Sequence, residues 1–131
     1  MNKIIKYGLV IRRDGKFLIN RKYGTKLFLM PGGKPKTGES IVDCLIREIK
    51  EEHDVELVKE SVRFFGEFED KAANEPDTII SMNVYTGEII GESVISSEIE
   101  EQKWFGRNDN LEILSPIIKN KILPALIKED I

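Results

Sequence analysis

Residues 33–55 (GKPKTGESIVDCLIREIKEEHDV) constrain the chain most, because they join a glycine turn to a helix rich in glutamate. An α-helix turns by about 100° per residue, so residues three and four apart lie on one face. Glu48, Glu51 and Glu52 should therefore form one carboxylate cluster. Such close like charges repel one another unless a cation lies between them. Mg²⁺ or Mn²⁺, which accept oxygen ligands, would suit this position.

The opposite face of the same helix is predicted to be buried. Ser40 followed by Asp43 matches a capping-box pattern, so the helix should begin there. It should end at His53 and Asp54, since Asp tolerates the left-handed conformation of a helix stop better than most residues. The predicted buried stripe repeats at four-residue steps with apolar neighbours: Ile41, Val42, Leu45, Ile46 and Ile49.

The rest of the chain is predicted to form mainly strands. Asp14-Gly15 is a tight-turn pair, which indicates a hairpin between the first two apolar runs. Ser115 and Pro116 begin a C-terminal amphipathic helix, which Pro124 should end or kink. One helix within a run of strands and a second at the end indicate a mixed α/β domain. The predicted strands cover residues 4–12, 16–20, 27–30, 62–69 and 78–90, and a further short strand is centred on Trp104-Phe105.

Size, charge and cysteine content narrow the class of protein. The 131 residues suit one domain, and the formal net charge of -3 disfavours a nucleic-acid polymer as partner. No apolar run approaches the roughly 18 residues that span a bilayer, and the first residues lack the pattern of a signal peptide. Cys44 is the single cysteine, so no intramolecular disulfide can form. We therefore expect a cytoplasmic protein without a membrane partner.

The glycine turn and acidic helix resemble the Nudix box, G-x5-E-x7-R-E-U-x-E-E-x-G-U, in which U is aliphatic. Gly33 is followed after five residues by Glu39, and after seven more by the run REIKEEHDV. The chain departs from the box at Asp54, where the box has Gly. The strand order resembles the MutT-like members. The resemblance implies that residues 1–131 form a single Nudix hydrolase domain, with a mixed β-sheet sandwiched between α-helices.

The resemblance also implies a metal site. Glu51 and Glu52 match the principal Mg²⁺ ligands of the family, and Mn²⁺ would be an alternative ion. Glu48 matches the glutamate that ligates a metal or handles the attacking water. The Gly33 carbonyl stands where a backbone oxygen often binds metal in this family.

Further roles follow from the same resemblance. Arg47 matches the arginine that orients the catalytic glutamate, with Glu39 in support. Another carboxylate usually comes from the loop before the tryptophan strand, as a ligand or general base. Glu98, which lies six residues before Trp104, is our choice, and Glu100 and Glu101 are its rivals.

The implied activity is Mg²⁺-dependent hydrolysis of a phosphoanhydride in a nucleoside diphosphate linked to another moiety. A nucleoside triphosphate, ordinary or oxidised, fits a short MutT-like chain best. The alternatives are a sugar nucleotide, a dinucleoside polyphosphate, or a catalytically idle Nudix-fold sensor that binds a nucleotide. The sequence is compatible with a monomer or a homodimer.

Other residues fit known chemistry less well. Cys44 lies between apolar neighbours and is predicted to be a small core residue. His53 is the single histidine, which argues against a two-histidine zinc site, and it is predicted to be a polar residue at the helix end. Trp104, Phe28 and Tyr85 could stack on a nucleobase, although core positions are more common for each. Residues 73–77 are either a substrate-selecting loop or an ordinary connection.

Overall fold

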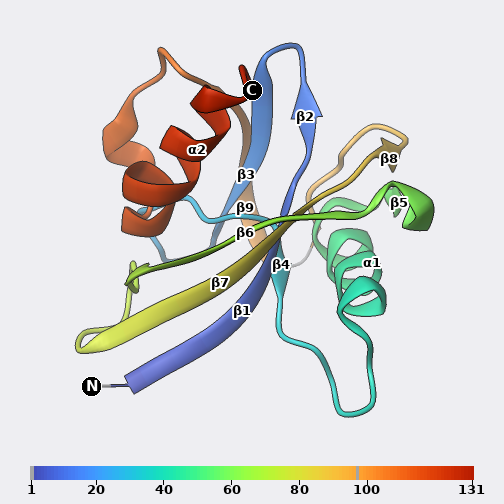
Figure 1. Ribbon diagram of the computed structural model, residues 1–131, viewed down its shortest axis with the longest axis horizontal. Helices are drawn as coiled ribbons and strands as arrows, with labels where there is room; N and C mark the ends of the chain where they lie inside the picture. Colours follow the sequence, from blue (N-terminus) through green and yellow to red (C-terminus); the bar gives the residue numbers. More distant parts are fainter. Residues whose placement is uncertain (1, 97) are drawn as a thin grey trace.

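The computed structural model describes residues 2–96 and 98–131 (Figure 1). One helix lies within a run of strands and a second helical segment ends the chain, as the sequence pattern predicts. The elements are β1 (Asn2–Val10), β2 (Arg12–Arg13), β3 (Lys16–Lys22), β4 (Gly32–Gly33), α1 (Ile41–His53), β5 (Glu56–Leu57), β6 (Arg63–Lys71), β7 (Thr78–Thr86), β8 (Ile89–Ile90), β9 (Ile99–Gly106) and α2 (Leu123–Lys128).

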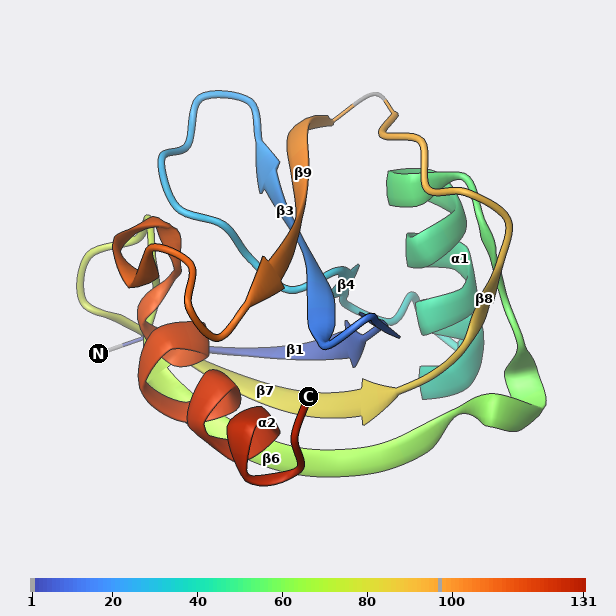
Figure 2. The same ribbon diagram turned by 90° about the horizontal axis from the view of Figure 1, so that it is seen from above.

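The main sheet is mixed, with the strand order β4-β1-β7-β6. β1 pairs in parallel with β7, and the other two pairings are antiparallel. A smaller antiparallel sheet has the order β2-β3-β9, and β5 pairs with β8. The helix α1 and the C-terminal helical segment lie on opposite sides of the strands (Figures 1 and 2). This arrangement confirms the predicted α/β fold, in which a mixed sheet lies between helices.

Two hydrophobic clusters hold these layers together, and β1 contributes to both. Leu9 and Ile11 pack in the cluster beneath α1, whereas Val10 packs in the cluster beneath the C-terminal helix. This division follows from the strand itself, because successive side chains point to opposite faces. Leu45 and Ile49 of α1 are fully buried in the first cluster, as the predicted apolar stripe requires.

The predicted boundaries of α1 are confirmed. Ser40 caps the helix, since its hydroxyl accepts the Asp43 backbone N–H at 3.1 Å. Asp54 ends it in the left-handed conformation, with φ 52° and ψ 39°. Its backbone N–H donates to the Lys50 carbonyl, and its side chain forms an ion pair with Lys50 at 3.0 Å. The residue that replaces the motif glycine therefore adopts the backbone geometry that suits glycine best.

The predictions for two strands were wrong in part. Residues 27–30 form no regular strand, because Phe28 and Leu29 make only isolated bridges, to Leu114 and Asn20. The paired residues are instead those of β4, two positions further on. The candidate strand at residues 78–90 is split into β7 and β8. Gly87 lies at the break, where an added Cβ would come 2.7 Å from a Leu57 methyl.

The prediction that Pro124 ends or kinks the last helix was also wrong in part. The helical segment continues through α2 to Lys128. A π-helical turn, Ile118–Ile122, comes directly before α2, and Pro124 lies in the first turn after it. Proline lacks an N–H, and a wide turn separates its ring from the preceding carbonyls, so the helix continues. Within the described residues, no helix has the length and apolar character needed to cross a membrane.

Candidate active site

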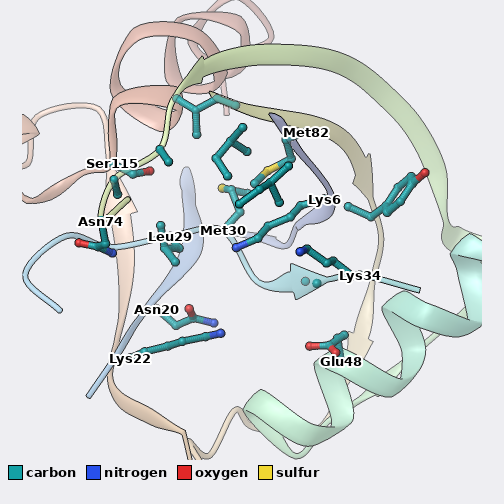
Figure 3. Close-up of a pocket in the computed structure, with 18 of the residues that line it drawn as sticks. Lys6, Asn20, Lys22, Leu29, Met30, Lys34, Glu48, Asn74, Met82 and Ser115 are labelled. Atoms are coloured by element: carbon teal, nitrogen blue, oxygen red, sulfur yellow. The ribbon is translucent and has the colours of Figure 1, made fainter. Parts of the chain in front are cut away.

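A cleft of about 430 Å³ lies beside the main sheet, next to the N-terminal half of β1 (Figure 3). The residues at one end are charged and come from β4, α1 and the end of β3. Those at the other end are largely apolar and come from β1, β7 and the start of the C-terminal helix. The charged end contains Gly32, Gly33, Lys34, Arg47, Glu48, Glu52, Lys22 and Glu98; the apolar end contains Ile4, Met30, Ile80, Met82 and Ile117.

The glycine pair of β4 brings the backbone close to the acidic helix. Gly32 and Gly33 pair with Gly8 and Tyr7 of β1. Gly32 has φ +140°, a conformation that side chains rarely adopt, and an added Cβ would clash with the Tyr7 carbonyl. A Cβ at Gly33 would lie 2.6 Å from the carboxyl carbon of Glu48. Glycine is therefore required at residue 32, whereas a side chain at residue 33 would displace the Glu48 carboxylate, against which the Gly33 backbone lies.

Glu52 is the buried carboxylate of the site. It is 8% exposed, and its Oε1 accepts the Gly32 backbone N–H at 3.1 Å. Burial is the main cause that raises the pKa of Glu52 to about 8; the Gly32 hydrogen bond acts in the opposite direction, and the Glu48 charge adds to the rise. A buried carboxylate with one hydrogen bond gains strongly from a nearby cation.

Arg47 holds Glu48 in place. Its Nη1 donates to Glu48 Oε1 at 2.6 Å, while Nε and Nη2 each donate to one oxygen of Glu39 at 2.9 Å. The guanidinium lowers the pKa of Glu39 to about 2, and the Lys36 backbone N–H contributes to the same shift. These contacts give the three residues one fixed geometry, as expected for bidentate arginine–carboxylate pairing.

The same arginine closes the loop between β4 and α1. Arg47 Nη2 donates to the Lys34 carbonyl at 3.2 Å, and Glu39 accepts the Lys36 backbone N–H at 2.9 Å. The motif residues Arg47 and Glu39 thus connect α1 to the segment that follows Gly33. The position of the loop backbone depends on this one guanidinium.

Glu51 lies apart from the other two glutamates. Its side chain is 50% exposed and approaches Arg47 Nη1 at 3.4 Å, and it is absent from the cleft lining. Within residues 2–96 and 98–131, no three His, Cys, Asp or Glu side chains converge closely enough to hold a metal by themselves. The three glutamates therefore do not form the predicted single cluster in this arrangement. Glu48 and Glu52 face the cleft, and Glu51 lies outside it.

Among the three candidates for the carboxylate from outside the helix, Glu98 is the one that reaches the cleft. It lines the charged end, and its Oε2 lies 3.9 Å from Lys22 Nζ. Glu100 and Glu101 pair instead with Arg21, at 2.7 and 3.1 Å, and neither lines this cleft. Glu98 precedes β9, whereas Glu100 and Glu101 belong to β9, where Glu101 lies opposite Arg21 of β3.

The donor set suits a hard divalent cation. Glu48 and Glu52 present carboxylate oxygens on one side of the cleft, and the Gly33 backbone adjoins Glu48. Oxygen donors of this kind are preferred by Mg²⁺ and Mn²⁺ rather than by softer ions. The raised pKa of Glu52 also fits, because a cation would compensate the charge that burial disfavours.

Sequence reasoning missed several residues of the cleft. Lys6, Lys22 and Lys34 extend into it from β1, β3 and the segment after β4 (Figure 3). Ser115 lies at the far end, and its buried Oγ has no hydrogen-bond partner within the described residues. Lys6 offered a signal in the sequence, since it shares the inward-facing parity of β1 with Val10, where charge is unusual. The positions of Lys22, Lys34 and Ser115 in the cleft depend on packing between distant parts of the chain, which the sequence pattern does not reveal.

The segment at residues 73–77 contributes to the cleft in part. Ala73, Asn74 and Glu75 line it, whereas Pro76 and Asp77 do not. The segment connects β6 to β7 and comes near Ser115, as the positions of Asn74 and Ser115 in Figure 3 show. The segment is therefore positioned to contact a molecule bound in the cleft. A connection that lay away from the cleft could not do so.

The aromatic candidates lie outside the cleft. Phe28 belongs to the buried cluster beneath the C-terminal helix. The ring of Tyr85 contacts the ring of Phe64 edge-on, with 5.3 Å between the ring centroids. Trp104 packs against the other cluster, beneath the Arg13 guanidinium. The core alternative is therefore correct for Phe28, whereas Tyr85 and Trp104 are partly buried and pack against the cluster beneath α1. These three residues do not line the cleft, so in this arrangement no base could stack on them there.

Cys44 and His53 are both buried. Cys44 is fully buried, as predicted, and burial raises the pKa of its thiol to about 11. His53 lies at the helix end, as predicted, but it is enclosed rather than solvated. Its Nε2 lies 2.9 Å from Asn20 Nδ2, and its Nδ1 lies 3.1 Å from Gln102 Oε1. These bonds join α1 to β3 and β9, and burial lowers the pKa of the ring.

Comparison with known proteins identifies the family. The NUDIX domain family matches residues 5–126, so the chain belongs to the Nudix family. Members of this family generally use divalent metal ions. The fold is similar to the solution structure of the E. coli ORF135 protein, with a TM-score of 0.75 and 24% identity over 98% of this chain and 91% of that one.

Two further similarities are informative. The curated protein "Uncharacterized Nudix hydrolase YvcI" of Bacillus subtilis (strain 168) is 29% identical over 104 residues, 76% of this chain. The chain spans 64% of the length of that relative. A structure described as a UDP-X diphosphatase has a TM-score of 0.72 and 17% identity, over 98% of this chain and 63% of that one. Similar folds thus occur in proteins with different descriptions.

Proposed function

We propose that this protein is a Nudix pyrophosphohydrolase that uses Mg²⁺ to cleave the phosphoanhydride of a nucleoside diphosphate linked to another moiety. The observation that carries the proposal is the pairing of buried Glu52 with Gly32 beside the Arg47-held Glu48, at the charged end of a cleft. Membership of the Nudix family supports the reaction class.

The acidic residues have different tasks in this proposal. Glu52, Glu48 and the Gly33 carbonyl would hold the metal, and Glu51 would join them by turning from Arg47. Bound Mg²⁺ supplies positive charge to the phosphate oxygens and acidifies a coordinated water. Arg47 keeps Glu48 oriented toward that region through its 2.6 Å hydrogen bond.

Glu98 is the proposed carboxylate from outside the helix, as a ligand or general base. Its support is its position, because it reaches the charged end of the cleft while Glu100 and Glu101 bind Arg21. Glu98→Gln should lower kcat by about 100-fold or more, the usual scale of general-base loss. Glu101→Gln is the matched control and should stay within about twofold of the parent. The reverse order would transfer the role to Glu101.

The proposed substrate is a nucleoside triphosphate, ordinary or oxidised. The two ends of the cleft support this class, since phosphates suit the charged end and a base suits the apolar end, where the Ser115 hydroxyl has no partner among the described residues. Asn74 and Glu75 of the β6–β7 connection would then adjoin the nucleoside.

A substrate panel tests the proposal. The purified protein would be incubated with Mg²⁺ and with nucleoside triphosphates, oxidised triphosphates, sugar nucleotides and dinucleoside polyphosphates, while released phosphate and pyrophosphate are measured. We expect metal-dependent release from triphosphates, and none with a chelator. Tight nucleotide binding without turnover on any member would contradict hydrolysis and indicate the sensor instead. Selective turnover of another class would replace the substrate assignment and keep the reaction.

A further inference from the structure

Lys6 occupies an unexpected position on β1. Its side chain shares a strand face with Ile4, Gly8 and Val10, and Val10 belongs to the cluster beneath the C-terminal helix. At Gly8, an added Cβ would lie 2.8 Å from the Met82 sulfur, which confirms that this face points inward. A lysine at such a position is uncommon, because burying an ammonium is costly without a partner.

The nearest cations make the position of Lys6 less favourable still. Burial lowers the pKa of Lys6, and the charges of Lys22 and Lys34 lower it further, while Glu75 and Glu52 act in the opposite direction. Within the described residues, no ion pair includes Lys6 or Lys34. The ion pair of Lys22 with Glu98 is long, at 3.9 Å.

The three side chains reach one cavity from separate elements. Lys6 comes from β1, Lys22 from the end of β3, and Lys34 directly follows β4, and all three extend into the cleft (Figure 3). Lysines that only solubilised the surface would point away from a cleft and from each other. Three converging ammonium groups instead form a site for an anion.

We propose that the Lys6, Lys22 and Lys34 ammonium groups bind an anionic group of the substrate beyond the diphosphate at the metal, with Lys6 as the residue that selects it. This inference rests on the proposed function and extends it, because it requires the moiety linked to the nucleoside diphosphate to be charged. A terminal phosphate meets that requirement, and a neutral hexose does not.

The donor chemistry favours a phosphate over a sugar. An ammonium group donates three hydrogen bonds and accepts none, so its partners must be acceptors. Phosphate oxygens are acceptors that also carry charge, and such bonds are about twice as strong as neutral ones. A hexose hydroxyl would leave the charge of the half-buried Lys6 uncompensated.

Lys6 should discriminate between charged and neutral substrate groups more strongly than Lys22 and Lys34 do. Lys22 already lies near Glu98, and Lys34 is exposed to solvent. Lys6 instead lies between the charged and the apolar ends of the cleft, with Lys34 on one side and Met30 and Met82 on the other (Figure 3). A charge in such surroundings is less screened, so its interaction with an added anion is stronger.

The experiment compares two substrates that share a base, a nucleoside triphosphate and a nucleoside diphosphate hexose. Lys6→Met removes the charge and keeps much of the side-chain length, while Lys6→Arg keeps the charge. Lys3→Met is the matched control, because Lys3 lies on the same strand, is exposed and pairs with Glu69 outside the cleft. Melting temperatures of all variants would be recorded first, to show that each folds.

We expect Lys6→Met to lower kcat/KM for the triphosphate by about 10- to 100-fold, the scale of a lost charged hydrogen bond. Its kcat/KM for the hexose compound should change by less than about threefold, and Lys6→Arg should recover most of the triphosphate activity. Lys3→Met should behave as the parent on both. Equal losses on the two substrates, or no loss on either, would overturn the selective role.

Binding supplies a readout that does not depend on turnover. Calorimetric titration of the metal-free protein with inorganic triphosphate and with inorganic pyrophosphate would be run on the parent and on Lys6→Met. We expect the variant to lose at least about tenfold in triphosphate affinity and less than about threefold in pyrophosphate affinity. Unchanged triphosphate affinity would refute the lysine site. A parent that hydrolyses no substrate would refute only the proposed function.

Discussion

At the scale of single residues, Arg47 organises the site. It contacts Glu39 through two bonds, Glu48 through one and the Lys34 carbonyl through another. One guanidinium thus fixes a carboxylate, a supporting carboxylate and the loop backbone. A lysine at this position would offer a point charge without the planar fork, so it could not satisfy the same set.

Glu52 provides the sharpest test of the metal assignment. Glu52→Gln keeps the size of the side chain and the acceptor for the Gly32 N–H but removes the charge. We expect it to lower Mg²⁺-dependent hydrolysis by at least about 100-fold, as for other losses of a preorganised electrostatic contact. Circular dichroism should remain that of the parent. Turnover equal to the parent would refute the role of Glu52 at the metal.

Ser115 provides a test of the apolar end of the cleft. Its buried Oγ has no hydrogen-bond partner within the described residues, so removing it should not destabilise the folded protein. We expect Ser115→Ala to leave the melting temperature unchanged or raised, and to increase KM by about three- to tenfold through a lost neutral hydrogen bond. A lower melting temperature with an unchanged KM would instead assign Ser115 to structure alone.

At the scale of elements, α1 has different functions on its two faces. Its apolar stripe packs on the cluster that contains Leu9 and Ile11, and its polar side presents Glu48 and Glu52 to the cleft. At its C-terminus, the bonds of His53 attach it to β3 and β9. The helix is therefore held both by its apolar stripe and at its C-terminal end, so the carboxylates are positioned by the core rather than by the loop alone.

The exit of α1 at Asp54 can be tested by stability. Asp54 has φ 52°, a conformation that glycine adopts without steric cost and that β-branched residues resist. We expect Asp54→Gly to change the free energy of unfolding in urea by no more than about 1 kcal/mol, because its gain in backbone geometry offsets the loss of the exposed Lys50 pair.

Asp54→Val is the matched contrast. It should destabilise the protein by about 1–2 kcal/mol, because the side chain must then adopt the left-handed conformation. Equal unfolding free energies for the glycine and valine variants would show that the conformation of residue 54 does not govern the helix end.

At the scale of the whole molecule, the two clusters divided by the main sheet set the position of the cleft. The cleft is lined by residues of β1, β4 and the end of β3 (Figure 3). The helix α1 and the C-terminal helical segment lie on opposite sides of these strands (Figure 2). Strands distant in sequence therefore contribute Lys6, Lys22 and Met82 to one cleft.

The pH dependence of stability is a property of the whole folded protein. The pKa of Glu52 is raised from 4.5 to about 8, so the metal-free native state binds a proton that the unfolded chain releases. We expect this group to lower the free energy of unfolding as pH rises from 4.5 to about 8. Urea titrations across that range would measure the slope, and Glu52→Gln should remove this contribution.

Mg²⁺ should reverse this trend, because it competes with the proton for Glu52. The increase in melting temperature produced by Mg²⁺ should therefore be larger at pH 8 than at pH 5. A constant increase across the range would contradict a metal site that includes Glu52.

Sequence reasoning predicted the local features of the molecule well. The spacing of Ile41, Leu45 and Ile49 predicted the buried face of α1, and the cap at Ser40 fixed its start, because both depend on residues within one or two turns. The segment at residues 27–30 was mistaken for a strand because burial alone explains its apolar character. Phe28 packs in the core without a ladder of backbone bonds.

The cleft itself was harder to predict. Glu48 and Glu52 follow from helical spacing and the motif, but the direction of Glu51 depends on its contact with Arg47. The placement of Lys6 and Ser115 depends on the packing of β1 against elements more than 70 residues away in sequence. No periodicity within a segment reports such contacts.

The left-handed backbone at Asp54 bears on how the family motif is defined. The motif names an amino acid at this position, yet the protein satisfies it with a backbone angle and a different side chain. The information held at that position is a torsion, and glycine is one way to supply it. A search pattern that demands glycine would pass over chains of this kind, whereas one that also admits aspartate would retain them.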